Sequence, residues 1–97
     1  MTPQETTDFI DSVTWEDCTV KYHGKIYWCL GLARYPKDNM IYAQVYEEDE
    51  KSHEFIRELL SYGSNSKDDC MKHFLEDKYW DGKSFYEVAP DMKWIDL

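Results

Sequence analysis

The chain has 97 residues, 16% of them aromatic, and its 20 acidic against 11 basic side chains give a formal net charge of −9. This length is typical of one domain that buries about two-thirds of its unfolded surface, and the aromatic content excludes the usual composition of a disordered chain. The acidic charge excludes direct binding to DNA or RNA, which needs clustered lysine and arginine. We therefore expect one small folded domain over residues 1–97.

The sequence favours a cytoplasmic protein without membrane contact. Its first residues, MTPQETTDFI, have neither the basic region nor the apolar core of a signal peptide. No stretch approaches the ~18 apolar residues of a membrane span. Three cysteines are too few for a secreted disulfide scaffold.

The motif TPQE predicts a helix N-terminus, with Thr2 as N-cap, Pro3 at the first helical position and Glu5 closing a capping box. A short helix over residues 3–11 follows from it. Its apolar anchors are Phe9, Ile10 and Val13.

Residues 18–47 are rich in valine, isoleucine and aromatics, and the turn signals HG at 23–24 and PKDN at 36–39 divide them. They predict a three-stranded antiparallel meander. A two-residue turn at HG pairs Cys18 with Cys29. The second hairpin pairs Gly31 with Gln44.

These registers sort the strand side chains into two faces, because strand side chains alternate. We expect one face to pack against the core: Ile26, Trp28, Leu30, Leu32, Ile41, Ala43 and Val45. The other face is rich in tyrosine: Cys18, Val20, Tyr22, Tyr27, Cys29, Tyr35, Met40, Tyr42, Gln44 and Tyr46.

Two further helices are predicted to cover the apolar face. The first spans residues 51–62, with a stripe of Phe55, Ile56, Leu59, Leu60 and Tyr62. The second begins after an N-cap at Ser66 and runs to about Tyr79, with Cys70, Met71, Phe74 and Leu75 on its stripe.

The last residues leave two readings open: SFYE at 84–87 fits a short helix, and MKWIDL at 92–97 fits an edge strand or a packed tail. The predicted fold class is therefore α+β. It is a three-stranded antiparallel meander packed on one face by two α-helices, with a short N-terminal helix and an irregular C-terminal segment. The order helix, meander, helix resembles the topology of double-stranded-RNA-binding domains, but the basic surface of that family is missing, so the likeness implies architecture alone.

A metal site is not predicted. Cys70 and His73 have a spacing seen in zinc ligands, but a helical wheel places Cys70 on the buried stripe and His73 between acids. Asp69, Glu76 and Asp77 surround His73 and could hold a divalent cation, although a solvated acidic face explains them as well. We expect no metal and no cofactor.

No catalytic group is predicted either. Cys18 and Cys29 lie opposite each other at a Cα separation of about 4.5–5.5 Å that a disulfide could bridge. A reducing compartment favours two small packed side chains over a redox pair. No strained nucleophile turn or phosphate-cradling glycine loop occurs, so the sequence favours a non-enzymatic protein and leaves an enzyme as a third alternative.

The tyrosine face is the main candidate binding surface, because tyrosine offers a large rigid contact area with a polar tip. The predicted binding residues are Tyr27, Tyr35, Tyr42, Tyr46, Glu47, Glu48, Asp49 and Glu50. The alternative is that the terminal segments, with Phe85, Trp94 and Ile95, cover this face as a second core.

The predicted function is that of a small acidic interaction or regulatory protein, a monomer or weak homodimer. Its tyrosine face and acidic rim bind a protein partner, and the acidic rim favours a basic one. The alternative is a nucleic-acid mimic that occupies the basic groove of a nuclease or DNA-binding protein. The chain is similar in size and charge to small acidic inhibitors carried by phages and mobile elements, a likeness of composition only.

Overall fold

The computed structural model describes residues 1–32 and 39–95. Within these ranges the chain forms three α-helices and five strands, which is an α+β fold. In chain order the elements are α1 (Pro3–Trp15), β1 (Cys18–Tyr22), β2 (Lys25–Cys29), β3 (Ile41–Glu48), β4 (Phe55–Ser64), α2 (Lys67–Glu76), α3 (Phe85–Val88), a 3-10 turn (Ala89–Asp91) and β5 (Met92–Ile95).

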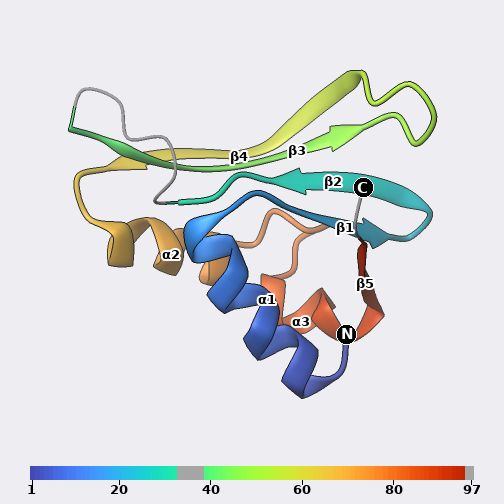
Figure 1. Ribbon diagram of the computed structural model, residues 1–97, viewed down its shortest axis with the longest axis horizontal. Helices are drawn as coiled ribbons and strands as arrows, with labels where there is room; N and C mark the ends of the chain where they lie inside the picture. Colours follow the sequence, from blue (N-terminus) through green and yellow to red (C-terminus); the bar gives the residue numbers. More distant parts are fainter. Residues whose placement is uncertain (33–38, 96–97) are drawn as a thin grey trace.

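The five strands form one antiparallel sheet in the order β4-β3-β2-β1-β5. The predicted three-stranded meander is present as β1, β2 and β3, but a strand is added on each side of it. All three helices lie against the same face of the sheet (Figure 1). The described helices therefore leave the opposite face of the sheet uncovered.

The sequence signals at both ends of the chain are confirmed. Thr2 and Glu5 form the capping box, and α1 extends beyond the predicted end to Trp15. Ser84 and Glu87 form a second capping box that starts α3. The segment after it pairs with β1 as the edge strand β5, so the prediction of an irregular C-terminal segment is wrong.

The helix predicted over residues 51–62 is wrong, because this segment is the second half of a β3–β4 hairpin. Two β-bulges leave Ile56 and Leu59 without a partner residue in β3. Each bulge shifts the alternation of side chains by one residue. The apolar spacing of a twice-bulged strand thus imitates the three-to-four-residue period of a helix.

The predicted register of the second hairpin is also wrong, by one residue. Cys29 lies opposite Val45, and the Leu30 amide donates to the Gln44 carbonyl at 3.0 Å. A one-residue shift exchanges the faces of a strand. Ala43 and Val45 therefore share a face with Cys29, whereas Tyr46 shares a face with Trp28.

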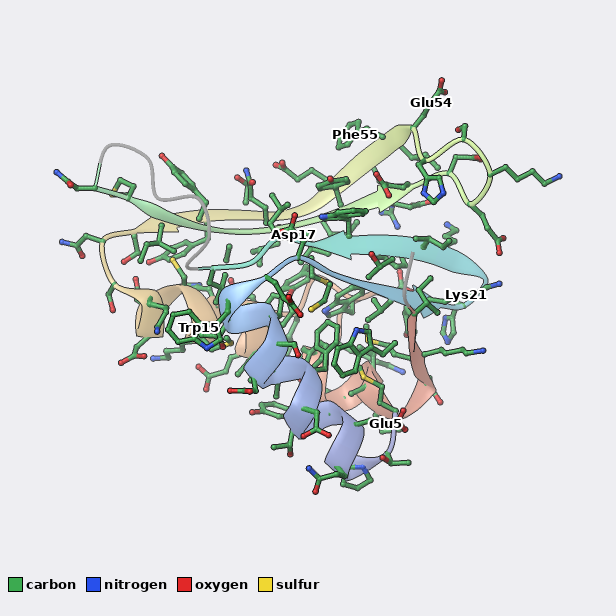
Figure 2. The ribbon with its side chains drawn as sticks, in the orientation of Figure 1. Glu5, Trp15, Asp17, Lys21, Glu54 and Phe55 are labelled. Carbon is green, nitrogen blue, oxygen red and sulfur yellow. The ribbon has the colours of Figure 1, made fainter. Side chains whose placement is uncertain are left out.

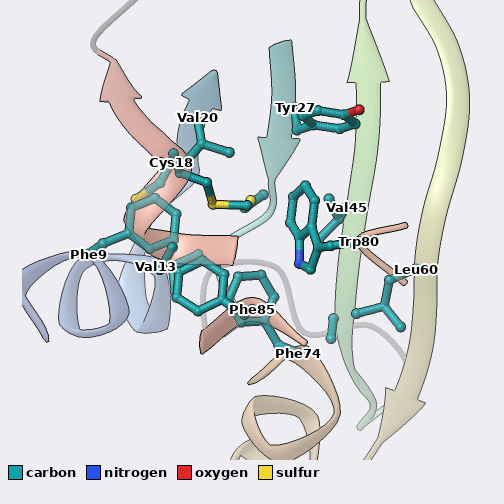
Figure 3. Packing of buried hydrophobic residues seen from close by; sticks show 14 of the residues in the cluster. Phe9, Val13, Cys18, Val20, Tyr27, Val45, Leu60, Phe74, Trp80 and Phe85 are labelled. Atoms are coloured by element: carbon teal, nitrogen blue, oxygen red, sulfur yellow. The ribbon is translucent and has the colours of Figure 1, made fainter. Parts of the chain in front are cut away.

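The core lies on the sheet face that was predicted to be the binding surface (Figure 3). Val20 and Cys29 are completely buried there. Phe9 of α1 stacks on Phe85 of α3, with ring centroids 5.5 Å apart, and Phe74 of α2 lies 5.2 Å from Phe85. The alternative that the terminal segments cover this face is thus confirmed for Phe85 and Trp94 over β1 and β2, whereas Ile95 lies on the opposite face of the sheet. Ile26 and Trp28 were predicted to pack against the core, but their side of the sheet lies away from the helices.

The helix α2 confirms the predicted separation of Cys70 from His73. Ser66 caps it by accepting from the Asp69 amide. Cys70 is fully buried and its thiol donates to the Ile41 carbonyl at 3.2 Å, whereas His73 Nδ1 lies 2.8 Å from Asp77 Oδ2.

Candidate functional site

An aromatic row lies on the uncovered face of the sheet. Trp28 of β2 and Tyr46 of β3 are directly opposite each other, and their rings are stacked with centroids 6.5 Å apart and planes 9° apart. The ring of Phe55, at the start of β4, lies 5.8 Å from that of Tyr46. We call these three residues, Trp28, Tyr46 and Phe55, the aromatic row.

The aromatic row becomes more exposed toward β4. Trp28 and Tyr46 are half-buried, and Phe55 is 63% exposed. Figure 2 shows Phe55 beyond β4, on the side away from the helices. Burial raises the pKa of Tyr46, helped by the charges of Glu48 and Asp17, so its hydroxyl stays protonated at neutral pH. A phenyl ring left in water beside two stacked aromatics is typical of a contact surface.

Acidic side chains border the aromatic row at the β3–β4 turn. Glu58 is opposite Tyr46, and Glu48 is opposite Phe55. Lys21 donates to Glu50 Oε1 at 3.0 Å. The exposed Glu58 therefore presents negative charge beside the aromatic row, whereas Glu48 is buried and Glu50 is paired with Lys21.

Two of the four predicted acids have structural roles within the hairpin. Glu47 is buried and accepts from Arg57 Nε at 2.8 Å. Asp49 Oδ2 accepts from the amides of Lys51 and Ser52, and the Ser52 amide bond is the main cause that lowers the pKa of Asp49. These bonds hold the turn that joins β3 to β4.

The structure corrects the idea of a single tyrosine face. Tyr27 lies on the helix side, 4% exposed, with its ring 5.1 Å from that of Trp80. Tyr42 and Tyr46 lie on the uncovered face, although the prediction placed them beside Tyr27. Tyr35 lies outside the described residues.

Sequence reasoning missed Trp28 and Phe55 because it assigned Trp28 to the core and Phe55 to a helix. In β3 both alternating sets contain apolar residues, so hydrophobicity alone does not choose the register. The acidic and polar run from Asp49 to Glu54 is the one signal that could have indicated a hairpin turn before a strand.

The cysteine pairing across the first hairpin is confirmed, with Cys18 directly opposite Cys29. Both thiols are reduced and buried. Burial strongly raises the pKa of Cys29, and burial is also the main cause that raises the pKa of Cys70. Thiols held in this protonated form are weak nucleophiles. Among the residues described, no group of three or more His, Cys, Asp or Glu side chains is arranged to hold a metal ion.

A separate apolar groove of about 740 Å³ lies between α1 and α3. Its lining residues are Met1, Pro3, Thr6, Thr7, Ile10, Tyr86, Ala89 and Pro90. The hydroxyls of Thr6 and Thr7 donate to carbonyls one helical turn earlier. The hydroxyl hydrogens of these two threonines are therefore already used within α1.

A polar cluster joins β4 to α2 on the helix side. The Tyr62 ring stacks on His73, with centroids 3.7 Å apart, and the Tyr62 hydroxyl donates to Asp69 Oδ2 at 2.6 Å. That bond is the main cause that lowers the pKa of Asp69 from its ordinary value of 3.8. The cluster therefore fastens the edge strand to the helix in a pH-dependent manner.

We expect Tyr62→Phe to lower the free energy of unfolding at neutral pH. Because the folded pKa of Asp69 lies below its unfolded value, the carboxylate stabilises the fold fully above that unfolded value and loses this effect as pH falls through the folded pKa. The difference between wild type and variant should therefore shrink below about pH 4. Urea denaturation at a series of pH values measures it.

The matched control is Tyr79→Phe, which removes a hydroxyl that donates to the Phe74 carbonyl at 2.7 Å. A backbone carbonyl does not titrate, so this variant should be destabilised equally at neutral and acidic pH. If both variants show the same acid dependence, the Tyr62 bond does not control Asp69.

Comparison with models of known protein families, with curated proteins and with solved structures finds no match to this chain. In the described ranges, no helix has both the length and the apolar character needed to cross a bilayer.

Proposed function

We propose that this chain is a non-catalytic interaction or regulatory protein that docks a basic protein partner on the uncovered face of its sheet. One observation carries the proposal: every described helix covers the same face, and the other face carries a stacked aromatic row that ends in an exposed ring beside acids. Aromatic anchors in the centre with charges at the rim are the usual anatomy of a binding surface.

Charge determines the kind of partner. The chain carries a formal charge of −9, and Glu58 and Glu48 lie directly opposite Tyr46 and Phe55 in the sheet. A negative field increases the association rate of a basic protein and disfavours a second copy of the same chain. A basic partner therefore fits this surface better than self-association.

The anchors differ from those expected at first. Tyr46 keeps its proposed role, and Tyr42, 36% exposed on the same face, extends the surface toward the far end of β3. Trp28 and Phe55 replace the buried Tyr27. Glu50 and the exposed Glu58 are the proposed steering charges, Glu48 is buried near them, and Glu47 and Asp49 hold the hairpin.

Site-specific photo-crosslinking in the source cells tests the surface. A photo-reactive phenylalanine analogue at position 55 should give an adduct with a basic protein, because Phe55 is exposed on the proposed surface. The same analogue at position 86 is the control, since Tyr86 is 56% exposed and belongs to α3 on the helix side. An identical adduct from both positions, or none from position 55, would contradict the proposal.

Affinity measurements with the purified partner show how much each aromatic residue contributes to binding. Phe55→Ala and Tyr46→Ala should each weaken affinity by about tenfold or more, as expected for aromatic anchors, whereas Tyr86→Ala should not. Docking through aromatic rings should persist at about 0.5 M salt, where exposed charges are largely screened. If binding is lost in salt and depends on many acids together, the nucleic-acid mimic is the better description.

A further inference from the structure

A small acidic pocket of about 220 Å³ lies between the β1–β2 turn and the β3–β4 turn. Both turns lie at the same end of the sheet (Figure 1). The residues lining the pocket are Gly24, Lys25, Ile26, Glu47, Glu48, Asp49, Glu50 and Ile56. Four of them carry carboxylates, so the pocket is built to attract positive charge.

Three of the four carboxylates are already engaged. Glu47 accepts from Arg57, Glu50 accepts from Lys21, and Asp49 accepts from amides of its own turn. Lys25, which also lines the pocket, is exposed and forms no ion pair with these carboxylates.

Glu48 is the exception. Its side chain is 9% exposed, and its Oε1 atom is buried without a hydrogen-bond donor from the described residues. The nearest cation-forming group is His53 Nδ1 at 3.8 Å, which is within ion-pair distance but beyond hydrogen-bond distance. Burying this oxygen atom without a donor is costly, because it has lost its hydrogen bonds to water and has gained none in exchange.

We propose that the pocket receives an arginine side chain of the basic partner, whose guanidinium pairs with Glu48. This inference rests on the proposed function and deepens it. A guanidinium matches a carboxylate with two parallel N–H donors and sheds water more readily than an ammonium group. Ile56, 50% exposed in the lining, supports the methylene stem of the arginine.

The test uses N-acetyl-arginine amide and its citrulline analogue, which keeps the shape and loses the charge. Each is titrated into the isotope-labelled protein at about 0.15 M salt, and amide shifts are followed by NMR. We expect saturable arginine-induced shifts at Gly24, Glu48 and Ile56. The affinity of the citrulline analogue should be lower by about tenfold or more, because citrulline cannot form the charged pair.

Glu48→Gln isolates the proposed group. It should weaken arginine binding by about tenfold or more, whereas Glu76→Gln, at an exposed acid of α2, should leave it unchanged. Glu48→Gln removes a buried charge whose Oε1 atom has no hydrogen-bond donor among the described residues, so the melting temperature of the variant should not fall. Lost binding with retained stability is the signature of a recognition group.

Arginine shifts that persist in Glu48→Gln, or that match those of citrulline, would overturn the arginine pocket, and so would the absence of saturable shifts. The photo-crosslink at position 55 does not depend on Glu48. A failed titration with an intact crosslink therefore removes the pocket and leaves the docking surface. A lost crosslink removes the docking surface whatever the titration gives.

Discussion

Phe85→Ala should cost about 3–5 kcal/mol of unfolding free energy, as expected when a fully buried phenylalanine is truncated. Phe85 is 0% exposed and lies 5.5 Å from the ring of Phe9 and 5.2 Å from that of Phe74. One side chain of a four-residue helix thus joins α1 and α2 to the C-terminal segment. Its removal leaves a cavity between three elements that cannot all close on it. Chemical denaturation followed by circular dichroism measures the loss.

The adjacent residue supplies the control. Tyr86 is in the same helix but is 56% exposed, so Tyr86→Ala should change stability by about 0.5 kcal/mol or less. Both variants replace an aromatic side chain by alanine at neighbouring positions, so they differ mainly in the burial of the side chain that is removed. A cost below about 1 kcal/mol for Phe85→Ala would show that α3 does not hold the helices together.

Gly31→Ala should cost about 1–3 kcal/mol, the range for overpacking a close contact. A Cβ at this position would lie 2.7 Å from the backbone carbonyl carbon of Glu16, at the C-terminal end of α1. The Gly31 amide donates to Asp17 Oδ1 at 2.8 Å, and the Leu32 amide donates to the Val13 carbonyl at 3.1 Å. The segment after β2 therefore cannot move away without breaking bonds to the end of α1.

Gly24→Ala distinguishes contact from conformation. A Cβ on Gly24 would meet nothing within 4 Å, but its φ of 77° strains any other residue by about 1 kcal/mol. Both variants should be destabilised, yet faster hydrogen exchange at the Leu32 amide is expected for Gly31→Ala alone. Equal exchange in the two variants would argue against the close approach to Glu16.

Local chemistry predicted the starts and ends of elements well. The boxes at Thr2 and Ser84 and the cap at Ser66 depend on a side chain and an amide three residues apart, so they can be read from the chain directly. The two-residue turn at His23 and Gly24 likewise fixed the register of the first hairpin. These features are determined within a few residues.

The candidate site could be predicted only in part. Tyr46 and the acidic run were predicted as binding residues from the sequence, but their neighbours in the candidate site were not. The position of Phe55 depends on a bulge, and the partnership of Trp28 with Tyr46 depends on a register that a single residue shifts. Neither the bulge nor the register is specified by a short-range sequence signal. The same pattern of side chains therefore fitted both the predicted and the observed pairing of β2 with β3.

The amino-acid sequence by itself determined an acidic α+β chain, its helix caps and its first hairpin, because these follow from charge, alternation and contacts between near neighbours. The tertiary structure alone decided which face of the sheet is covered. Helices from both ends of the chain pack on the face of Val20, Cys29 and Val45, where small and branched side chains receive Phe9 and Phe85. The free energy gained by burying the rings of Phe9 and Phe85 outweighs the preference set by the alternating side chains of the strands. The aromatic row and the Glu48 pocket therefore lie on the outer side of the sheet.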